Sequence, residues 1–509
     1  MGISIDANRA KNSAIGVLFF YFVAHAYSAL NLFPGWDSVN HIFYYGEIEE
    51  AQIGRYLRFI VPVFRGNVMT PWMISLISVG LLLATTYLVT EMLEFERPIC
   101  IVLSGGILST NFCITSIKAL YIWIEDALML SLFLAVLGIY LVWKKISYCY
   151  ILSSLSFFVS FGLYQAFSST IAVIILIIIL KNVYQNPIVT KEKIRRLFDY
   201  IIPGAIGVVL YFIGLKALSL SELGAATGRG NTMDAALGHG VYDYIDQLYD
   251  NLTELIRLFF IPYNSHTGGW TYPNMLQIGG ILLLVVGIIS YIIQIRCFSR
   301  KDRFVATCLI VVLIASIASA SIIINVCSWI KYLSYRLVYA IFLIYLVFIG
   351  IISEWQFKRK EKTSFGIMIV AFSFVLFWNI RMSNDVYIYQ QIAYERAVIA
   401  VSKMMDDIED DYDGDNQIVL VGNMALNDKY ADYSKDYIEY FIELTNTSLG
   451  YQQLVSSMAG TLGPGQSFIS DDSLDGKYSQ MQEVMEMPIY PQKGYHKLID
   501  GNIIVKLSE

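Results

Sequence analysis

The stretch FVATCLIVVLIASIASASIIINVC, residues 304–327, contains no charged side chain in 24 consecutive positions. A helix needs about 20 predominantly apolar residues to cross the hydrocarbon core of a bilayer, so this stretch predicts a transmembrane helix. The rest of the chain is similar, because 56% of its 509 residues are hydrophobic and only 15% are charged. Soluble domains carry about 25% charged residues. The composition therefore indicates a polytopic membrane protein and excludes a disordered chain, a fibrous repeat and an ordinary cytosolic enzyme.

Further apolar runs on both sides of this stretch bring the predicted spans to about eleven. The first run lacks a small-residue cleavage site and leads into more spans, so no cleavable signal sequence is expected. We predict the fold class to be an α-helical polytopic membrane protein with a small α/β domain after the last span. The predicted spans are residues 13–31, 70–91, 99–117, 121–143, 147–163, 166–182, 200–220, 274–296, 304–327, 334–353 and 364–382.

Charge is distributed unevenly between the two predicted domains. Residues 1–382, the membrane domain, hold 28 Lys and Arg against 21 Asp and Glu, a net charge of +7. Residues 383–509 hold 8 against 21, a net charge of −13, and the two values add up to the −6 of the whole chain. An acidic domain of this kind argues against a nucleic-acid partner, because phosphates would be repelled. Within it, a polar helix at 384–408 and strands at 418–421 and 503–505 indicate an α/β fold.

Lysine and arginine residues in the loops predict the orientation of the membrane domain. With the N-terminus in the cytoplasm, the loops on that side hold 18 basic residues and those on the other side hold nine. An odd number of spans then places the C-terminal domain outside, together with two long loops at 32–69 and 221–273. Apolar residues at helical spacing in both loops predict amphipathic helices on the membrane surface. In the second loop this stripe comprises Val241, Ile245, Leu248, Leu252, Leu255 and Phe259.

Acidic residues at the membrane are the first candidates for chemistry, because a charge there is costly. Asp37 follows the first span, beside Trp36, where a weakly polar surrounding suits a carboxylate to act as a base. The alternative is that Asp37 caps the helix that follows it. Glu125 and Asp126 begin the fourth span. As neighbours they point to adjacent helix faces, so they cannot act as a stacked pair, and one of them is the second candidate for a catalytic role.

Arginines at the outer end of the membrane domain are candidates for binding phosphate. Arg55 and Arg58 lie one turn apart in the first loop, on one face of a helix, where two guanidinium groups can clamp a phosphate. Arg336 lies at the outer end of the tenth span and offers a third guanidinium group. The alternative for these arginines is snorkelling to lipid headgroups.

The sequence indicates neither a metal site nor a cofactor. The six cysteines lie in or beside apolar runs and form no Cys-x-x-Cys pair, which argues against a zinc site and a disulfide framework. Asp411, Asp413 and Asp415 have the spacing that begins a calcium loop, but position 422 is Gly instead of the closing Glu. The glycines at 224–230 do not have the spacing of a nucleotide-binding fingerprint. A divalent metal is compatible with the sequence but is not indicated by it.

Several segments together carry a resemblance to a known family. They are the acid after the first span followed by Gly54-Arg55-Tyr56, the run 115–141, the segment Gly162-Leu163-Tyr164-Gln165-Ala166, and the helix 384–408 with Gln390-Gln391. Over most of residues 13–410 the chain resembles the type II O-antigen glucosyltransferases of bacteria, which are polytopic enzymes of the GT-C class. One departure is that Ser38 follows Asp37 where the family commonly has a second acid.

The resemblance implies transfer of a hexosyl unit from a polyprenyl-phosphate donor to a surface glycan such as O-antigen, on the outer face of the bacterial cytoplasmic membrane. A carboxylate, Asp37 or else Glu125 or Asp126, would take the proton of the attacking hydroxyl. Arg55, Arg58 and Arg336 would stabilise the leaving phosphate. Four further side chains would contact the sugar or the acceptor, namely His41, Tyr56, Tyr164 and Gln165.

Two other functions compete with this interpretation. A lipid-linked oligosaccharide flippase or polysaccharide exporter is expected to have inverted repeats and helices broken at the midplane. Neither feature is evident in the sequence, and the charged residues gather at the outer rim instead. A polysaccharide polymerase or ligase typically has one dominant outer loop late in the chain, whereas here the first loop is the richest in polar residues.

Overall fold

The computed structural model describes most of the membrane domain and the two ends of the C-terminal domain. The described residues are 5–34, 38, 41, 54–58, 60–186, 191–219, 240–264, 269–270, 273–328, 333–355, 362–411, 416–422 and 472–508. Within them, nine helical segments are long and apolar enough to cross a membrane, and two shorter apolar segments accompany them. These eleven segments correspond in position to the eleven predicted spans. The predicted fold class, a polytopic helical membrane protein, is therefore confirmed.

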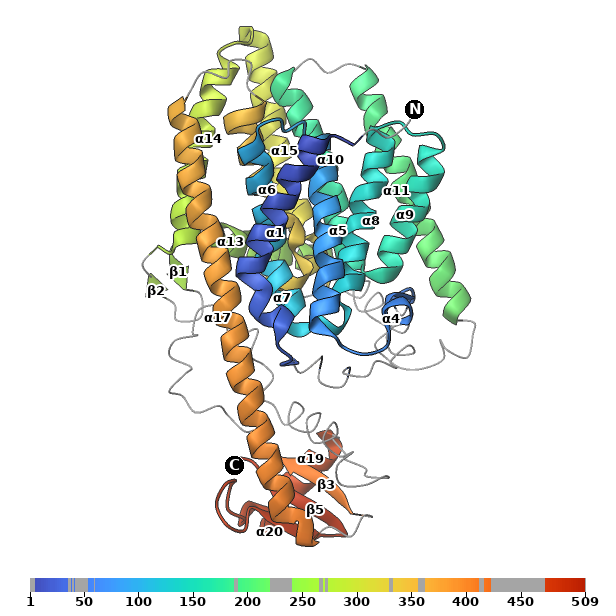
Figure 1. The fold of residues 1–509 in the computed structure, drawn as a ribbon, viewed down its shortest axis with the longest axis vertical. Helices are drawn as coiled ribbons and strands as arrows, with labels where there is room; N and C mark the ends of the chain where they lie inside the picture. The colour runs from blue at the N-terminus through green and yellow to red at the C-terminus, as the bar shows by residue number, and fades with distance from the viewer. Residues whose placement is uncertain are drawn as a thin grey trace.

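The helices of the bundle follow the predicted order along the chain (Figure 1). The long spans are formed by α1 (Ala7–Leu30), α5 (Pro71–Met92), α6 (Pro98–Thr110) with α7 (Phe112–Leu120), η1 (Ile122–Ile124) with α8 (Glu125–Trp143), η2 (Gln165–Phe167) with α10 (Ser168–Gln185), α11 (Lys191–Ser219), α14 (Met275–Ile295), α15 (Arg300–Cys327) and α17 (Lys362–Ile408). The shorter ones are α9 (Cys149–Leu163) and the segment made of η5 (Tyr339–Leu343), α16 (Ile344–Ile349) and η6 (Gly350–Glu354).

Helices α1 and α6 pack with their backbones close together. A side chain at Gly16 would bring its Cβ within 2.5 Å of the Val102 carbonyl oxygen. Small residues permit such close contacts in membranes, where dispersion forces and not the exclusion of water drive helix association. One face of α1 thus packs on α6. The opposite face of α1, which includes Phe19 and Phe22, is exposed.

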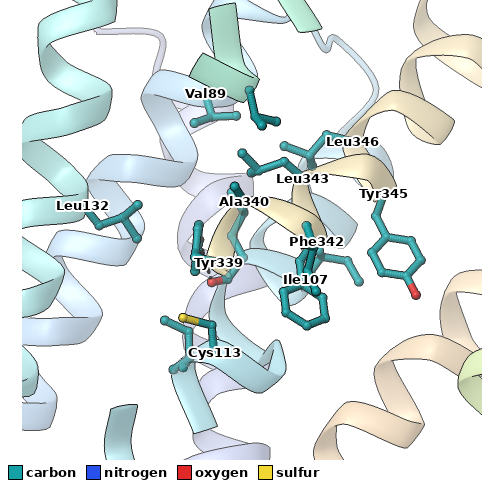
Figure 2. Close-up of a cluster of buried hydrophobic side chains, with 14 of the residues drawn as sticks. Val89, Ile107, Cys113, Leu132, Tyr339, Ala340, Phe342, Leu343, Tyr345 and Leu346 are labelled. Carbon is teal, nitrogen blue, oxygen red and sulfur yellow. Dashed lines mark hydrogen bonds between the residues drawn. The ribbon is translucent and has the colours of Figure 1, made fainter. Parts of the chain in front are cut away.

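The segment from Tyr339 to Glu354 is irregular, since it combines a 3-10 helix, an α-helix and a π-helix. Irregular backbone is tolerated at membrane depth only where protein surrounds it. Figure 2 shows that side chains of this segment, among them Tyr339 and Phe342, lie in a buried cluster with Ile107 and Cys113. The hydroxyl of Tyr339 donates a hydrogen bond to the Leu108 carbonyl, at 3.0 Å. The tenth span is therefore an interior element of the bundle.

The long outer loops contribute short elements. The first contains α4 (Ile60–Arg65), and most of its other residues lie outside the described part of the chain. The second contains α13 (Val241–Phe260) and an antiparallel pair, β1 (Tyr263–Asn264) with β2 (Gly269–Trp270). Of the predicted stripe on α13, Phe259 is buried and Leu248, Leu252 and Leu255 are partly buried, whereas Val241 and Ile245 are exposed. A hydrogen bond from Asn325 to Asn251, at 2.6 Å, joins α13 to α15.

Helix α17 continues from the bundle into the C-terminal domain (Figure 1). Its 47 residues correspond to about 70 Å at 1.5 Å per residue. The domain contains a three-stranded sheet in the order β3-β5-β4, with β3 (Gln417–Val421) parallel and β4 (His496–Ile499) antiparallel to β5 (Asn502–Lys506). The end of α17 covers one face of this sheet, and the short helices α19 (Asp472–Ser479) and α20 (Gln482–Met485) cover the other. Both predicted strands are confirmed.

Figure 1 shows the N-terminus at one end of the bundle, and α4 and the C-terminal sheet toward the other end. Helix α4 of the first outer loop and the C-terminal sheet therefore lie on the same side of the bundle, as the odd number of spans predicts. Which side faces the cytoplasm stays a prediction from the distribution of lysine and arginine.

We predict that a cysteine at Lys493, exposed in the C-terminal domain, reacts with an impermeant thiol reagent in intact cells. A cysteine at Lys145, exposed between α8 and α9, is expected to react only after permeabilisation. Both variants are made in a background without the six native cysteines. The opposite pattern of labelling would contradict the predicted orientation.

Candidate functional site

The arginines named from the sequence meet around one buried side chain, Tyr164, at the turn between α9 and η2. The guanidinium carbons of Arg55 and Arg58 lie 5.0 and 5.9 Å from the centroid of its ring. The hydroxyl of Tyr164 donates a hydrogen bond to the backbone carbonyl of Arg336, at 3.0 Å. One tyrosine therefore joins the first outer loop to a segment about 280 positions further along the chain.

Arg336 belongs to a short 3-10 helix, η4 (Tyr335–Leu337), that precedes the irregular span. Its Nη1 donates a hydrogen bond to the hydroxyl of Tyr121, at 2.7 Å, and its guanidinium carbon lies 5.5 Å from the centroid of that ring. Tyr121 precedes η1, at the break between α7 and α8. The three arginines thus stack on two tyrosines, each of which lies at an interruption of the helical bundle.

The backbone of the arginine loop is fixed by hydrogen bonds from the bundle. The side-chain amide of Gln165 donates to the Gly54 carbonyl at 2.9 Å, and the hydroxyl of Tyr211 donates to the same carbonyl at 3.2 Å. The backbone NH of Leu57 donates to the Gly162 carbonyl at 3.0 Å. Gly54 has φ +79°, a backbone conformation that glycine adopts without strain. Gln165, expected to contact sugar, here contacts the loop that carries Arg55.

Burial distinguishes these arginines from residues that snorkel to headgroups. Arg58 is fully buried, and Arg55 is partly buried. The Nε of Arg55 is buried and has no hydrogen-bond partner among the described residues. A buried guanidinium NH without an acceptor is energetically unfavourable unless a ligand supplies one. The loop therefore presents a preformed donor for an anionic group.

The other two candidates from the first loop contact aromatic side chains. Tyr56 donates a hydrogen bond to the Tyr211 carbonyl at 3.0 Å and stacks on the Tyr211 ring. Burial raises the pKa of the Tyr56 hydroxyl above its usual range, so this group stays a neutral donor. The ring of His41 stacks on the indole of Trp123 with 3.9 Å between centroids and 5° between planes. Tyr56 is directed towards α11, and His41 lies over η1.

The two adjacent acids of α8 form separate buried ion pairs. Glu125 accepts from Lys118 at 2.8 Å and from the Tyr21 hydroxyl at 2.8 Å. Asp126 accepts from Arg65 at 2.6 Å. The adjacent acids therefore point to different partners, as their spacing predicts. Asp37 lies outside the described residues, so its role stays a prediction. Its neighbour Ser38 is fully buried and donates to the Leu120 carbonyl at 2.6 Å.

Several polar residues of this region were not singled out from the sequence as part of a site. Lys118 and Arg65 counted only towards the orientation, although two opposite charges near each other in apolar surroundings are a signal of pairing. His25 gave no signal, because it is a single polar residue in an apolar helix. It is fully buried, with Nδ1 2.7 Å from the Tyr387 hydroxyl and Nε2 2.9 Å from the Ser109 carbonyl oxygen. Among the described residues, no group of three or more His, Cys, Asp and Glu could hold a metal ion.

The fold and this cluster define a multi-pass membrane protein with a cationic, largely buried site at the interruptions of its helices. The chain belongs to the glucosyl transferase GtrII family, whose model matches residues 26–335. This match confirms the resemblance found in the sequence and identifies the protein as a glucosyltransferase. No curated protein and no solved structure matches the chain. Arg336, α17 and the C-terminal sheet lie beyond the matched residues.

We predict that Gly54→Ala lowers sugar transfer by about 10-fold or more, because the arginine loop must shift. An alanine would be strained at φ +79°, and its Cβ would lie 2.5 Å from the Tyr211 hydroxyl and 2.9 Å from the Gln165 amide nitrogen. Gly501→Ala is the matched control. Gly501, in the C-terminal domain, also has a positive φ, +76°, but no atom lies within 4 Å of the added Cβ. Equal losses of transfer in the two variants would contradict a role of the Gly54 contacts.

Proposed function

We propose that this protein transfers a hexosyl unit, glucosyl in keeping with its family, from a polyprenyl-phosphate donor to a cell-surface glycan. The transfer takes place at the outer face of the bacterial cytoplasmic membrane, in the manner of GT-C glycosyltransferases, with O-antigen or another surface polysaccharide as the acceptor. The observation that carries this proposal is the stacking of Arg55 and Arg58 on Tyr164, next to the Arg336 segment.

A phosphate accounts for the chemistry of this cluster better than a neutral sugar does. Guanidinium groups offer paired, planar donors that match phosphate oxygens. The guanidinium group of Arg55 lies over the Tyr164 ring, which carries no formal negative charge, and its buried Nε lacks an acceptor among the described residues, so Arg55 keeps its capacity to bind an anion. In surroundings of low dielectric constant, such an anion interacts more strongly than it does in water.

The lipid part of the donor explains why the site lies in a helical membrane protein. A polyprenyl chain dissolves in the bilayer, and its phosphate lies at the interface, where the arginine loop joins the bundle. Several helices near this end expose large apolar side chains, as expected for surfaces that face lipid. The donor therefore reaches the arginines from the membrane, and the acceptor glycan reaches the same site from the aqueous side.

The proposed reaction is a displacement at the anomeric carbon of the donor sugar. A carboxylate takes the proton from the acceptor hydroxyl as its oxygen forms the new glycosidic bond. The bond between the anomeric carbon and the phosphate oxygen breaks, and polyprenyl phosphate leaves with the electron pair. Arg55, Arg58 and Arg336 stabilise the negative charge that grows on the phosphate. We assign the role of the base to Asp37, from its position in the sequence after the first span.

The test is an assay of the purified protein with synthetic polyprenyl-phosphate hexoses and a glycan acceptor. Acceptor-dependent release of polyprenyl phosphate is the expected result. If the donor is moved across liposome membranes without being consumed, the protein is a flippase and the proposal fails. If preformed glycans are joined without consumption of the monosaccharide donor, the protein is a polymerase or ligase.

Arg55→Lys is predicted to weaken donor use about 10-fold or more without changing expression. Lysine keeps the charge and snorkels equally well, but it lacks the planar pair of donors. A contact made mainly with the leaving phosphate lowers kcat and kcat/KM together, whereas a contact made equally with the bound donor changes KM alone. Arg381→Lys is the control, because Arg381 is an exposed arginine that stacks on Trp378. Full activity of Arg55→Lys would refute the phosphate contact and leave Arg336 as the better candidate.

Asp37→Asn is predicted to lower turnover by about 10² to 10⁴ while donor binding is kept, because the amide has the same shape but cannot accept the proton. Glu483→Gln, an exposed carboxylate of the C-terminal domain, controls for a general loss of negative charge. Turnover is measured by release of polyprenyl phosphate, and binding by competition with an unreactive donor analogue. Turnover like that of the wild type would exclude Asp37 as the base.

A further inference from the structure

Four charged side chains that adjoin the arginine cluster are buried in two ion pairs. Lys118 pairs with Glu125 at 2.8 Å, and both side chains are 0% exposed. Arg65 pairs with Asp126 at 2.6 Å, with side chains 2% and 0% exposed. The two acids are consecutive in the sequence, but their partners come from different segments, Lys118 from α7 and Arg65 from the end of α4.

Such an arrangement is costly for a membrane protein. Each ion loses its hydration, and a buried ion pair often stabilises a fold no better than apolar side chains of the same size would. Buried pairs are, however, specific, because a charge left without its partner is strongly unfavourable. Charged residues at membrane depth are therefore expected to serve a function beyond stability.

The segment between the two pairs contacts the candidate site. It consists of Tyr121 and η1, and it lies between Lys118 on one side and Glu125 and Asp126 on the other. Tyr121 accepts the hydrogen bond from Arg336, and Trp123 stacks on His41. Arg65 also donates to the backbone carbonyl of Trp123 at 2.8 Å. Arg65 thus binds the acid at the start of α8 and the backbone of η1 at the same time.

Further hydrogen bonds extend each pair into the surrounding helices. Lys118 donates to the Ser75 hydroxyl at 2.6 Å and to the Tyr21 hydroxyl at 3.1 Å, which connects α7 to α5 and α1. Arg65 donates to the Val68 carbonyl at 2.7 Å, which fixes the end of the first outer loop. One pair therefore ties η1 to the interior of the bundle, and the other ties it to the outer loop.

We propose that Lys118, Glu125, Arg65 and Asp126, together the η1 clamp, position Tyr121 and Trp123 for the reaction. Glu125 and Asp126 are then positioning residues that act through Arg336 and His41, and neither is the base. This inference rests on the proposed function, because it assigns to the clamp the geometry of the phosphate-binding arginines. It also explains why the apolar helix α8 begins with two adjacent acids, since the charge of each acid is neutralised by a different cation.

A double-mutant cycle distinguishes a positioning pair from a catalytic carboxylate. Asp126→Asn leaves the Arg65 cation buried without its partner, and Arg65→Gln leaves the Asp126 anion in the same state. The double variant removes both charges, so the clamp predicts that it is more active than either single variant. We expect single variants about 10 to 100 times less active than the wild type, and a double variant within about 10-fold of it. If Asp126 is the base, the double variant stays as inactive as Asp126→Asn.

The second pair gives an independent cycle with Lys118→Met and Glu125→Gln, and the same pattern of rescue is expected. Arg381→Gln with Asp385→Asn is the matched control, because the side chains of this pair are 56% and 36% exposed and lie 3.3 Å apart. Exposed pairs contribute little, so this control is expected to show less than about a twofold coupling in activity. If single variants of the clamp do not fold, the activities of the double variants alone test the proposal.

Two further measurements separate this proposal from the proposed function. Thermal unfolding of the same variants requires no substrate, so rescue of the melting temperature tests the ion pairs even if the wild type consumes no polyprenyl-phosphate hexose. The pH dependence of kcat is expected to keep its shape in the active double variants, whereas loss of the base would remove its acidic limb. Recovered stability without recovered transfer would overturn the positioning role, and the absence of coupling in both measurements would overturn the clamp.

Discussion

The requirement that every backbone polar group in a bilayer find a partner within the protein governs this structure. The candidate site lies at interruptions of the helices. There, backbone NH and carbonyl groups that would bond to each other in an unbroken helix need other hydrogen-bond partners. Asn111 caps α7 by accepting from the backbone NH groups of Cys113 and Ile114. The Ser131 hydroxyl lies at hydrogen-bonding distance from the Ser160 and Tyr164 carbonyl oxygens. Tyr164 and Gln165 then satisfy the carbonyls of Arg336 and Gly54. Two of the side chains that pair with these backbone groups, Tyr164 and Gln165, are thus also the ones that bring the arginine segments together.

The cationic side chains of this region have two different kinds of partner, carboxylates and aromatic rings. Lys118 and Arg65 lie opposite carboxylates in buried pairs, so their charge is neutralised within the protein. Arg55 lies instead on an aromatic ring, and an NH group of its guanidinium is left for another acceptor. A protein can bury a cation in either way, but only the second leaves it able to bind an anionic substrate. The same residue type therefore serves structure at position 65 and, in our proposal, chemistry at position 55.

The sequence predicts the elements of this fold far better than their contacts. Uninterrupted apolar runs predict the eleven membrane segments, and short apolar runs bounded by turn residues predict two strands, because both are local properties of the chain. The spacing of Arg55 and Arg58, with Arg336 at a span end, also suggests the arginine cluster, but the helix predicted to carry the first two is wrong, because residues 54–58 form turns. The partners of Glu125 and Asp126 depend on how α4 and α7 pack, which no local pattern records. Helices that are apolar on all sides do not reveal which face is inward, so the backbone contacts of Gln165 and the burial of His25 could not be predicted.

Helix α17 connects the two domains without an interruption. Gln390 donates to the Ala119 carbonyl at the end of α7, and Tyr27 donates to Gln391, so the helix is held against the bundle beyond its apolar part. Tyr394 packs against the hydrophobic clusters of both domains, and from Ala397 onward α17 covers the C-terminal sheet. The sheet lies on the side of the bundle that carries α4 (Figure 1). Residues 383–509, with their net charge of −13, therefore follow a helix that leaves the bundle on the side where the arginine loop lies.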